Sequence, residues 1–192
     1  MQRAPLLLSV LILCITLATA SLATAGGSAY TTYNMWYEVP TQMWAINYKR
    51  GTLLPAGTLV KNITINKEKI HLFQSISFKR VSDNKHFRVH LRRKFHPGKT
   101  IENYRQSMFT RQRLKEQTAD MTEREINAIL RGVLVTGMSK KAVKVAYGIP
   151  PQHKTPNLQG NIWRYWTSRL VSKNICFDKN GRTVRCVTNE TL

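Results

Sequence analysis

Residues 122–148, TEREINAILRGVLVTGMSKKAVKVAYG, decide the fold of the C-terminal half of this chain. Thr122 and Glu125 have the pattern of a capping box, in which each residue hydrogen-bonds the backbone of the other at a helix start. Gly132 ends this first helix, while Ser139 caps a second helix that ends at Gly148. Each helix is about three turns long, so it is stable only when it packs against other elements.

The apolar residues of the two helices predict which faces become buried. Ile126, Ile129 and Leu130 form the stripe of the first helix. Val143 and residues 145–147 form that of the second helix. Both apolar stripes must be buried against another element of the fold.

Three strands are expected to supply that cover. Trp163, Tyr165 and Phe177 provide the large apolar area for the contact. The half is therefore predicted to be an α+β domain of two layers, with two helices packed on a three-stranded antiparallel sheet. The expected strands are residues 162–168, 172–177 and 183–188.

Short strands and turns predict a small β-barrel in the N-terminal half. Residues 60–65 alternate apolar and polar side chains, and further strands are expected at 70–73, 75–81 and 86–91. After Pro97-Gly98, Thr100 caps an expected connecting helix from Ile101 to about Lys115. Residues 30–48 are rich in aromatic side chains, which either fill the barrel core or form a stacking platform for bases or sugars.

The first 25 residues have the pattern of a cleaved export signal. Arg3 precedes a nearly apolar run at 6–17, and Ala-Thr-Ala occurs at 18–20 and 23–25 as two small-residue cleavage sites. The run is too short for the roughly 20 residues of a spanning helix. We expect a periplasmic or secreted protein that begins at Ser21 or Gly26. The expected division is residues 1–25 (signal), 26–99 (barrel), 100–120 (connecting helix) and 121–192 (α+β domain).

Two cysteines lie beyond this signal, Cys176 and Cys186, on either side of Asn180-Gly181. In an oxidising compartment such neighbours commonly pair. A two-residue turn sets Cys176 opposite Arg185, and a three-residue loop leaves the cysteines diagonal, about 7–8 Å apart at the backbone. That separation exceeds the usual disulfide range unless a bulge intervenes. The sequence leaves open a disulfide or two small buried hydrophobes.

The charge of the chain points to an anionic partner. Lys and Arg total 30 against 10 Asp and Glu, which gives a net charge of +20 and a pI near 10.4. Such a surface attracts lipid head groups, lipopolysaccharide, peptidoglycan or an acidic protein. Because export removes the chain from the cytoplasm, no nucleic acid is expected as a partner.

The basic residues gather around one expected strand, residues 86–91. Phe87, Val89 and Leu91 alternate with polar and basic residues, so one face packs while the other is positive. This face is either a solvated surface or a stripe that binds anionic surfaces. The candidate binding residues are Lys79, Arg80, Lys85, Arg88, Arg92, Arg93 and Lys94.

No catalytic, cofactor or metal site is expected. His86 and His90 share a strand face about 13 Å apart, too far to hold one zinc ion. His153, between two prolines, is expected to be an ordinary loop residue. There is no Ser/His/Asp order, no Cys-His motif and no Gly-rich phosphate loop. Many of the ten acidic residues lie in helix caps and turns, which leaves few carboxylates for acid/base catalysis. We therefore expect a protein that is not an enzyme.

The residues that end the helices, form the turns and supply the aromatic side chains of the C-terminal half follow an order that resembles a known family. The pattern consists of four short motifs: Gly137-Met-Ser-Lys140, Gly148-Ile-Pro150, Trp163-x-Tyr165 and Phe177-Asp-x-x-Gly181-x-x-Val184. Taken in this order, over about residues 121–188, they are similar to the SmpA/OmlA domain, the BamE-like fold. Residues 51–58, GTLLPAGT, look like the opening hairpin of a bacterial Src-homology-3-like barrel.

The resemblance implies a periplasmic, non-enzymatic role in outer-membrane protein assembly or envelope integrity. Members of the family are often anchored through a lipidated cysteine after the signal, whereas Cys14 lies inside the apolar run. The leading hypothesis is an envelope binding or scaffold protein that contacts envelope proteins and anionic lipid or glycan. The alternative is an inhibitor-like or secretion-linked module that docks on another protein.

Overall fold

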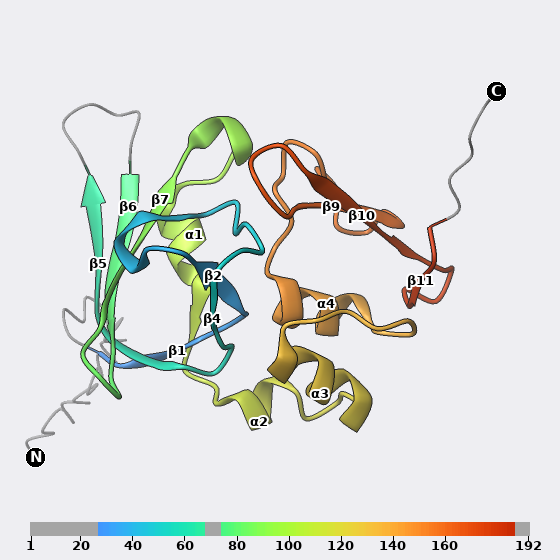
Figure 1. Cartoon of the computed structure of the whole chain (residues 1–192), viewed down its shortest axis with the longest axis horizontal. Coiled ribbons are helices and arrows are strands. Elements are labelled where there is room, and N and C mark those ends of the chain that lie inside the picture. The colour runs from blue at the N-terminus through green and yellow to red at the C-terminus, as the bar shows by residue number, and fades with distance from the viewer. Residues whose placement is uncertain (1–26, 68–73, 187–192) are drawn as a thin grey trace, which may run out of the picture.

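The computed structural model describes residues 27–67 and 74–186. The expected export signal, the expected strand at 70–73 and positions 187–188 lie outside these residues. The chain has a mixed α+β fold with a curled six-stranded sheet, a three-stranded antiparallel sheet and a two-stranded pair (Figure 1). No helix in the described ranges has the length and apolar character needed to cross a membrane.

The six-stranded sheet has the order β3-β7-β6-β5-β1-β8. Its neighbours are antiparallel except β3 and β7, which are parallel. The strand predicted at 86–91 is confirmed, and that predicted at 75–81 begins and ends one residue earlier. The strands are β1 (Ala29–Thr31), β3 (Met43–Trp44), β5 (Leu59–Lys67), β6 (Gln74–Arg80), β7 (His86–Leu91) and β8 (Phe109–Thr110).

The core of this N-terminal region lies on the concave side of the sheet. Phe78 and Phe87 are fully buried there and stack with ring centroids 5.3 Å apart. The helix α1 (Ile101–Met108) contributes Tyr104 to the same core. The predicted helix to Lys115 is wrong in length, because residues after Met108 become extended and pair with β1 as β8.

The expected hairpin at residues 51–58 does not form. The strand β4 (Thr52–Leu54) pairs instead with β2 (Met35–Tyr37), whereas β5 pairs with β1 and β6. A short helix, α2 (Leu114–Gln117), then leads out of the N-terminal region. We use "N-terminal region" for the described residues up to Gln117 and "C-terminal region" for residues 118–186.

The two predicted helices of the C-terminal region are confirmed. They are α3 (Glu123–Arg131) and α4 (Lys140–Tyr147). The Thr122 side chain accepts from the Glu125 backbone N–H, and Gly132 closes α3 in the left-handed conformation with φ 66°. Ser139 likewise caps α4 through the Ala142 N–H.

The buried face of α3 differs from the prediction. Leu130 is 52% exposed, whereas Glu125 and Ala128 are buried with Ile129. Glu125 accepts hydrogen bonds from the Ser139 N–H at 2.7 Å and the Thr122 N–H at 2.9 Å. A carboxylate that receives such bonds can be buried, and this one sets which side of α3 faces α4.

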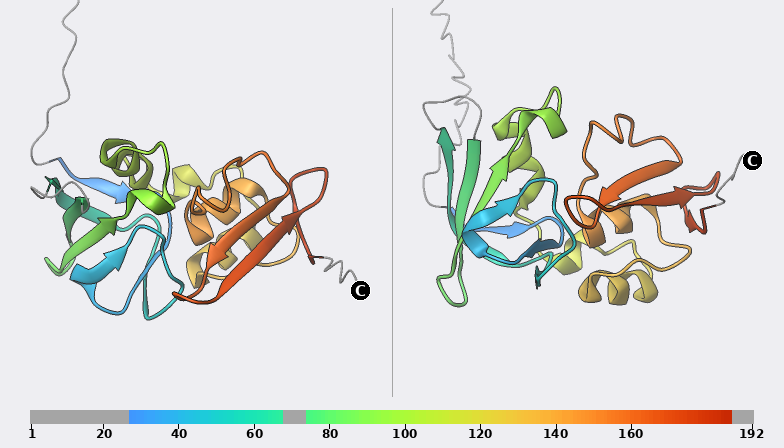
Figure 2. Two further views of the ribbon diagram at one scale, coloured as in Figure 1. Left: turned by 90° about the horizontal axis from the view of Figure 1, so that it is seen from above. Right: turned by 45° about the horizontal axis from the view of Figure 1, so that its top comes forward.

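The three-stranded sheet has the order β11-β10-β9 and packs over α4. Trp163 and Tyr165 are 1% exposed and Phe177 is also buried, as predicted. In Figures 1 and 2, α4 lies between α3 and this sheet. The strands are β9 (Ile162–Trp166), β10 (Ser172–Phe177) and β11 (Thr183–Val184), of which the first and last are shorter than predicted.

Asn34, between β1 and β2, joins the two regions. Its backbone N–H donates to Val145 O at 2.9 Å, and its Nδ2 donates to Ala146 O at 3.1 Å and Ile129 O at 2.7 Å. Its Oδ1 accepts from the Ala56 N–H at 2.7 Å. Because the last carbonyls of a helix lack partners within it, the N-terminal region satisfies the C-terminal ends of α3 and α4.

Lys49 completes the same junction. Its Nζ donates to Tyr147 O at 2.6 Å and lies 4.4 Å from the centroid of the Trp36 ring and 5.5 Å from that of Tyr165. Burial lowers the pKa of Lys49 well below its usual value. The carbonyl at the helix end and the ring faces favour the charged form. This lysine therefore serves the junction rather than the solvent-facing basic surface.

Candidate anion-binding site

The outward face of the six-stranded sheet carries positive side chains in cross-strand rows. Lys61 on β5 lies opposite Lys79 on β6, and His86 on β7 lies on the other side of Lys79 in the same row. Like charges placed directly opposite destabilise a sheet. Two lysines placed in this way repel each other, and a bound anion would offset that repulsion.

The next row places Arg88 beside short polar side chains. Arg88 pairs with Ser77, and its Nε donates to Ser77 Oγ at 3.3 Å. Asn66 Nδ2 donates to the same Oγ at 2.8 Å. These bonds hold Arg88 over the sheet, where it is half-buried.

A third row ends in an aromatic ring. Trp44 on β3 lies opposite His90 on β7, with the two ring centroids 5.6 Å apart. The 3₁₀-helix η1 (Pro40–Gln42) lies beside this row, and Thr41 O is 3.2 Å from His90 Nε2. The Trp44 side chain remains 36% exposed.

The predicted stripe is divided in the structure. Arg80 lies on the other face of β6, with its guanidinium 5.7 Å from the centroid of the Phe87 ring. Its Nε donates to Asp83 Oδ1 at 2.9 Å, and this hydrogen bond lowers the pKa of Asp83 far below its usual value. Lys85 is exposed in the β6–β7 turn. Alternation along β6 therefore removes Arg80 from the surface that Lys79 and Arg88 share.

Beyond β7, the chain turns into a short 3₁₀-helix, η2 (Arg93–Phe95). Arg92 precedes it, with its guanidinium 4.9 Å from the centroid of the Trp44 ring. Arg93 and Lys94 are exposed on η2. The end of the basic stretch thus bends away from the sheet.

A cavity of about 300 Å³ lies where η2 meets the C-terminal region. Figures 1 and 2 show the tip of the β9–β10 hairpin beside the connection between β3 and β4. Among the described residues, the lining includes no Asp or Glu. Three cations and three aromatic rings form it: Arg92, Lys94, Arg169, Trp44, Tyr48 and Phe95.

Tyr48 lines the same cavity as Arg92 and Arg169. Burial raises the pKa of Tyr48, and the positive charges of Arg169 and Arg92 oppose that rise. A positive field of this kind stabilises an oxyanion. The cavity therefore presents positive charge and a phenol hydroxyl group to any anion that enters it.

His153 fastens η2 to the C-terminal region and is more than an ordinary loop residue. Its backbone N–H and its Nδ1 lie 3.3 and 3.1 Å from Phe95 O. Its ring stacks on Trp166, with centroids 6.3 Å apart and planes 11° apart. This contact holds the cations of η2 near the hairpin.

A larger cavity, of about 500 Å³, lies between α1, β8 and α4. Its lining includes Lys141, Lys144 and Glu116, so its charges are mixed. Lys141 is also ion-paired with Asp120 at 2.6 Å. We place the candidate site in the smaller cavity, where the charge has one sign.

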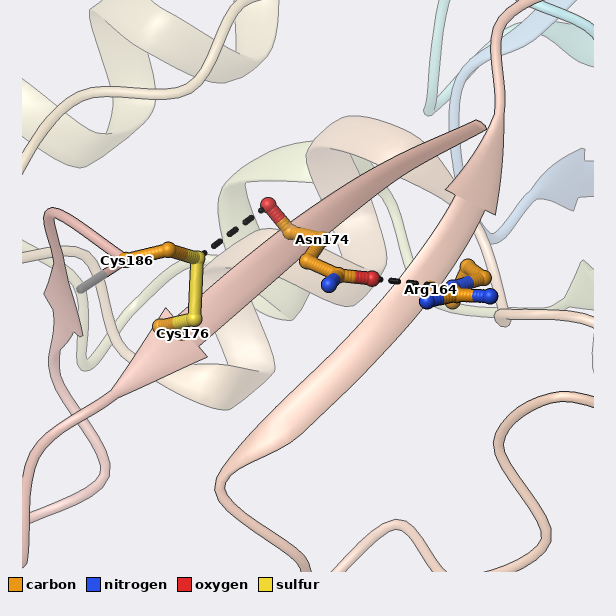
Figure 3. Close-up of a disulfide and its surroundings, with 4 residues drawn as sticks. All are labelled: Arg164, Asn174, Cys176 and Cys186. Atoms are coloured by element: carbon orange, nitrogen blue, oxygen red, sulfur yellow. Dashed lines mark hydrogen bonds between the residues drawn. A yellow bond between two sulfur atoms is a disulfide. The ribbon is translucent and has the colours of Figure 1, made fainter. Parts of the chain in front are cut away.

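A disulfide joins Cys176 and Cys186 on the outward face of the three-stranded sheet (Figure 3). The hairpin has a three-residue loop, which predicts diagonal cysteines. Their Cα atoms are nevertheless 5.2 Å apart. The ladder ends at Val184, so the following residues can turn back toward β10. Cys186 Sγ also lies 3.5 Å from Asn174 O.

No group of three or more potential ligands able to hold a metal ion occurs within residues 27–67 and 74–186. His86 and His90 take part in the rows described above. Arg169 and Tyr48 were not predicted as partners of the basic residues Arg92 and Lys94. The sequence marks these two residues only as a cation and an aromatic ring. It does not indicate that Arg169, in a loop far along the chain, lies beside Arg92.

Comparisons of this chain with models of protein families, with curated proteins and with solved structures find no match.

Proposed function

We propose that this protein is a periplasmic, non-enzymatic binding or scaffold protein of the cell envelope, peripheral to the outer membrane, whose basic sheet face contacts anionic lipid or glycan. In this proposal the N-terminal region is a small β-barrel, and the C-terminal region is a two-layer SmpA/OmlA-like domain that contacts envelope proteins. The motif resemblance supports the second part. The rows of Lys61, Lys79, His86 and Arg88 support the first.

The observation that carries the proposal is the single sign of charge on the sheet face. Within the described residues, its rows contain no carboxylate to neutralise Lys79 or Arg88. Each cation near an anionic membrane contributes roughly 1 kcal/mol of attraction. Several such residues on one face are enough for peripheral binding that depends on salt.

A specific surface favours the alternative of a protein-docking module. Ile162 and Val184 lie on either side of Cys176 on the outward face of the three-stranded sheet. They are 60% and 41% exposed. An apolar row beside a disulfide is a suitable surface for a protein partner. This surface and the basic face lie on different regions, so one scaffold protein can use both.

Binding to anionic vesicles tests the proposal. The double reversal Lys79→Glu and Arg88→Glu should weaken binding to phosphatidylglycerol vesicles by well over tenfold at low salt, because two attractions become repulsions. The effect should shrink as salt rises, since the screening length is about 8 Å at physiological ionic strength. Vesicle co-sedimentation over a salt series measures both.

The control is the double reversal Arg124→Glu and Arg131→Glu on α3, which changes the net charge by the same amount. Both control residues are exposed. Equal losses in the two double variants, or no binding by the unchanged protein at low salt, would contradict a binding role for the sheet face.

A further inference from the structure

The cavity at the junction differs from the sheet face because it is concave and lined by rings. Arg92, directly before η2, and Lys94 on η2 reach it, and Arg169 reaches it from the β9–β10 hairpin. We infer that this cavity binds a phosphate group carried on a sugar ring. The inference deepens the proposed function and rests on it only for the source of the ligand.

The charges of the cavity match a phosphate monoester. Such a group carries a charge of about −1.5 to −2 and three strong acceptor oxygens. Guanidinium groups such as those of Arg92 and Arg169 offer planar forks that pair with phosphate oxygens, and Lys94 adds a compact positive charge. A carboxylate, with a single negative charge, would pair with fewer of these three cations.

The rings of the cavity favour a sugar over a bare anion. Trp44 and Tyr48 each combine a flat apolar face with a polar end. Because Arg92 lies over the Trp44 ring, the apolar face of a sugar ring can pack on Tyr48 and on the exposed part of Trp44, while its hydroxyl groups reach the Tyr48 oxygen. The volume of about 300 Å³ is at the lower end of the range for small-molecule sites, which suits a single phosphorylated sugar.

The residues after Arg169 distinguish two sources of such a ligand. Leu170 and Val171 are 91% and 57% exposed at the hairpin tip. If the phosphorylated sugar belongs to a lipid, these side chains are placed to enter the adjoining apolar layer. If the sugar is free in solution, they contribute nothing.

Titration of the full chain with glucose 1-phosphate, with glucose as the uncharged comparison, tests the inference. Calorimetry at low salt should detect binding of the phosphate and at least tenfold weaker binding of glucose. Arg169→Gln should weaken phosphate binding at least tenfold, since a charged hydrogen bond is lost from an exposed loop that does not support the core. Lys94→Gln should act in the same direction.

The matched control is Arg131→Gln, which removes the same charge from α3 and should leave the affinity unchanged. Failure of glucose 1-phosphate to bind, or equal losses in Arg169→Gln and Arg131→Gln, would overturn the cavity as a site. Neither result would bear on the proposed role of the sheet face, because binding to phosphatidylglycerol vesicles tests that role separately through Lys79 and Arg88.

Vesicles of phosphatidylcholine with a small fraction of lipid A identify the source. Leu170→Asp should weaken vesicle binding without changing the affinity for glucose 1-phosphate if the ligand is lipid-borne. If Leu170→Asp changes neither vesicle binding nor the affinity for glucose 1-phosphate, the ligand of this cavity is a soluble phosphorylated sugar.

Discussion

The N-terminal and C-terminal regions are built in different ways. In the first, β1 pairs with β5 and β8, so the sheet depends on contacts between distant parts of the chain. In the second, α3, α4 and the hairpins follow one another, and each end is set by a nearby cap or turn. Strands that are distant in the chain can pair only after the loop between them has closed, which costs entropy. A helix cap acts between residues a few positions apart and needs no such closure.

The comparison also shows that neither region is complete by itself. The carbonyls of Val145, Ala146 and Tyr147 at the end of α4 receive their hydrogen bonds from Asn34 and Lys49. Buried carbonyls without partners are costly. We therefore expect the two regions to unfold together, even though their elements form by different routes.

The largest expected effect comes from the core of the C-terminal region. Trp163→Ala should lower the free energy of unfolding by about 3–5 kcal/mol, because a fully buried ring is removed. Denaturation by urea, followed by circular dichroism, measures the change. Phe87→Ala makes the equivalent change in the N-terminal core.

Both substitutions should shift one common transition. A loss below about 1 kcal/mol for Trp163→Ala would show that its packing is unimportant. Two separate transitions, each sensitive to only one of the substitutions, would break the expectation of joint unfolding.

The junction itself supplies the next effect. Asn34→Ala removes three side-chain hydrogen bonds from a fully buried position, and each contributes roughly 1 kcal/mol, so we expect a loss of about 3 kcal/mol. The same denaturation experiment measures it. Asn127→Ala, at an exposed site on α3, should change stability by less than about 0.5 kcal/mol. Equal stability of the two variants would mean that the junction is not needed by either region.

The smallest effect depends on pH and arises near η2. Burial lowers the pKa of His96 to about 4, with smaller contributions from the charges of His153 and Lys99. Below its ordinary pKa of about 6.5, the unfolded chain binds a proton that the folded chain does not. Stability should therefore fall as pH decreases from about 6.5 toward 4 and level off below that.

Relative to His96→Asn, the unchanged protein should lose about 2.5 kcal/mol between pH 7.5 and 4.5. Denaturation curves of both proteins at the two pH values give this difference. The variant keeps a polar side chain without titrating, so the other groups cancel in the comparison. A difference that does not vary with pH would show that His96 takes up its proton equally in both states.

Prediction from the sequence succeeded where the responsible residues are close together. The capping residues Thr122 and Ser139 and the alternation of β7 each act over a few positions. It failed where a distant partner decided the outcome, as when β1 drew the residues after Met108 out of a helix. The burial of Glu125 in place of Leu130 depends in the same way on the approach of Ser139.

By itself, the sequence determined the positive charge, the helix ends of the C-terminal region and the polar alternation that makes one face of β7 basic. These follow from composition, local hydrogen bonding and strand period, which need no knowledge of other segments. Only the tertiary structure decided that Asn34 completes α4 and that Arg169 joins Arg92 around one cavity. Residues far apart in the chain meet only through packing, and local patterns do not encode that packing.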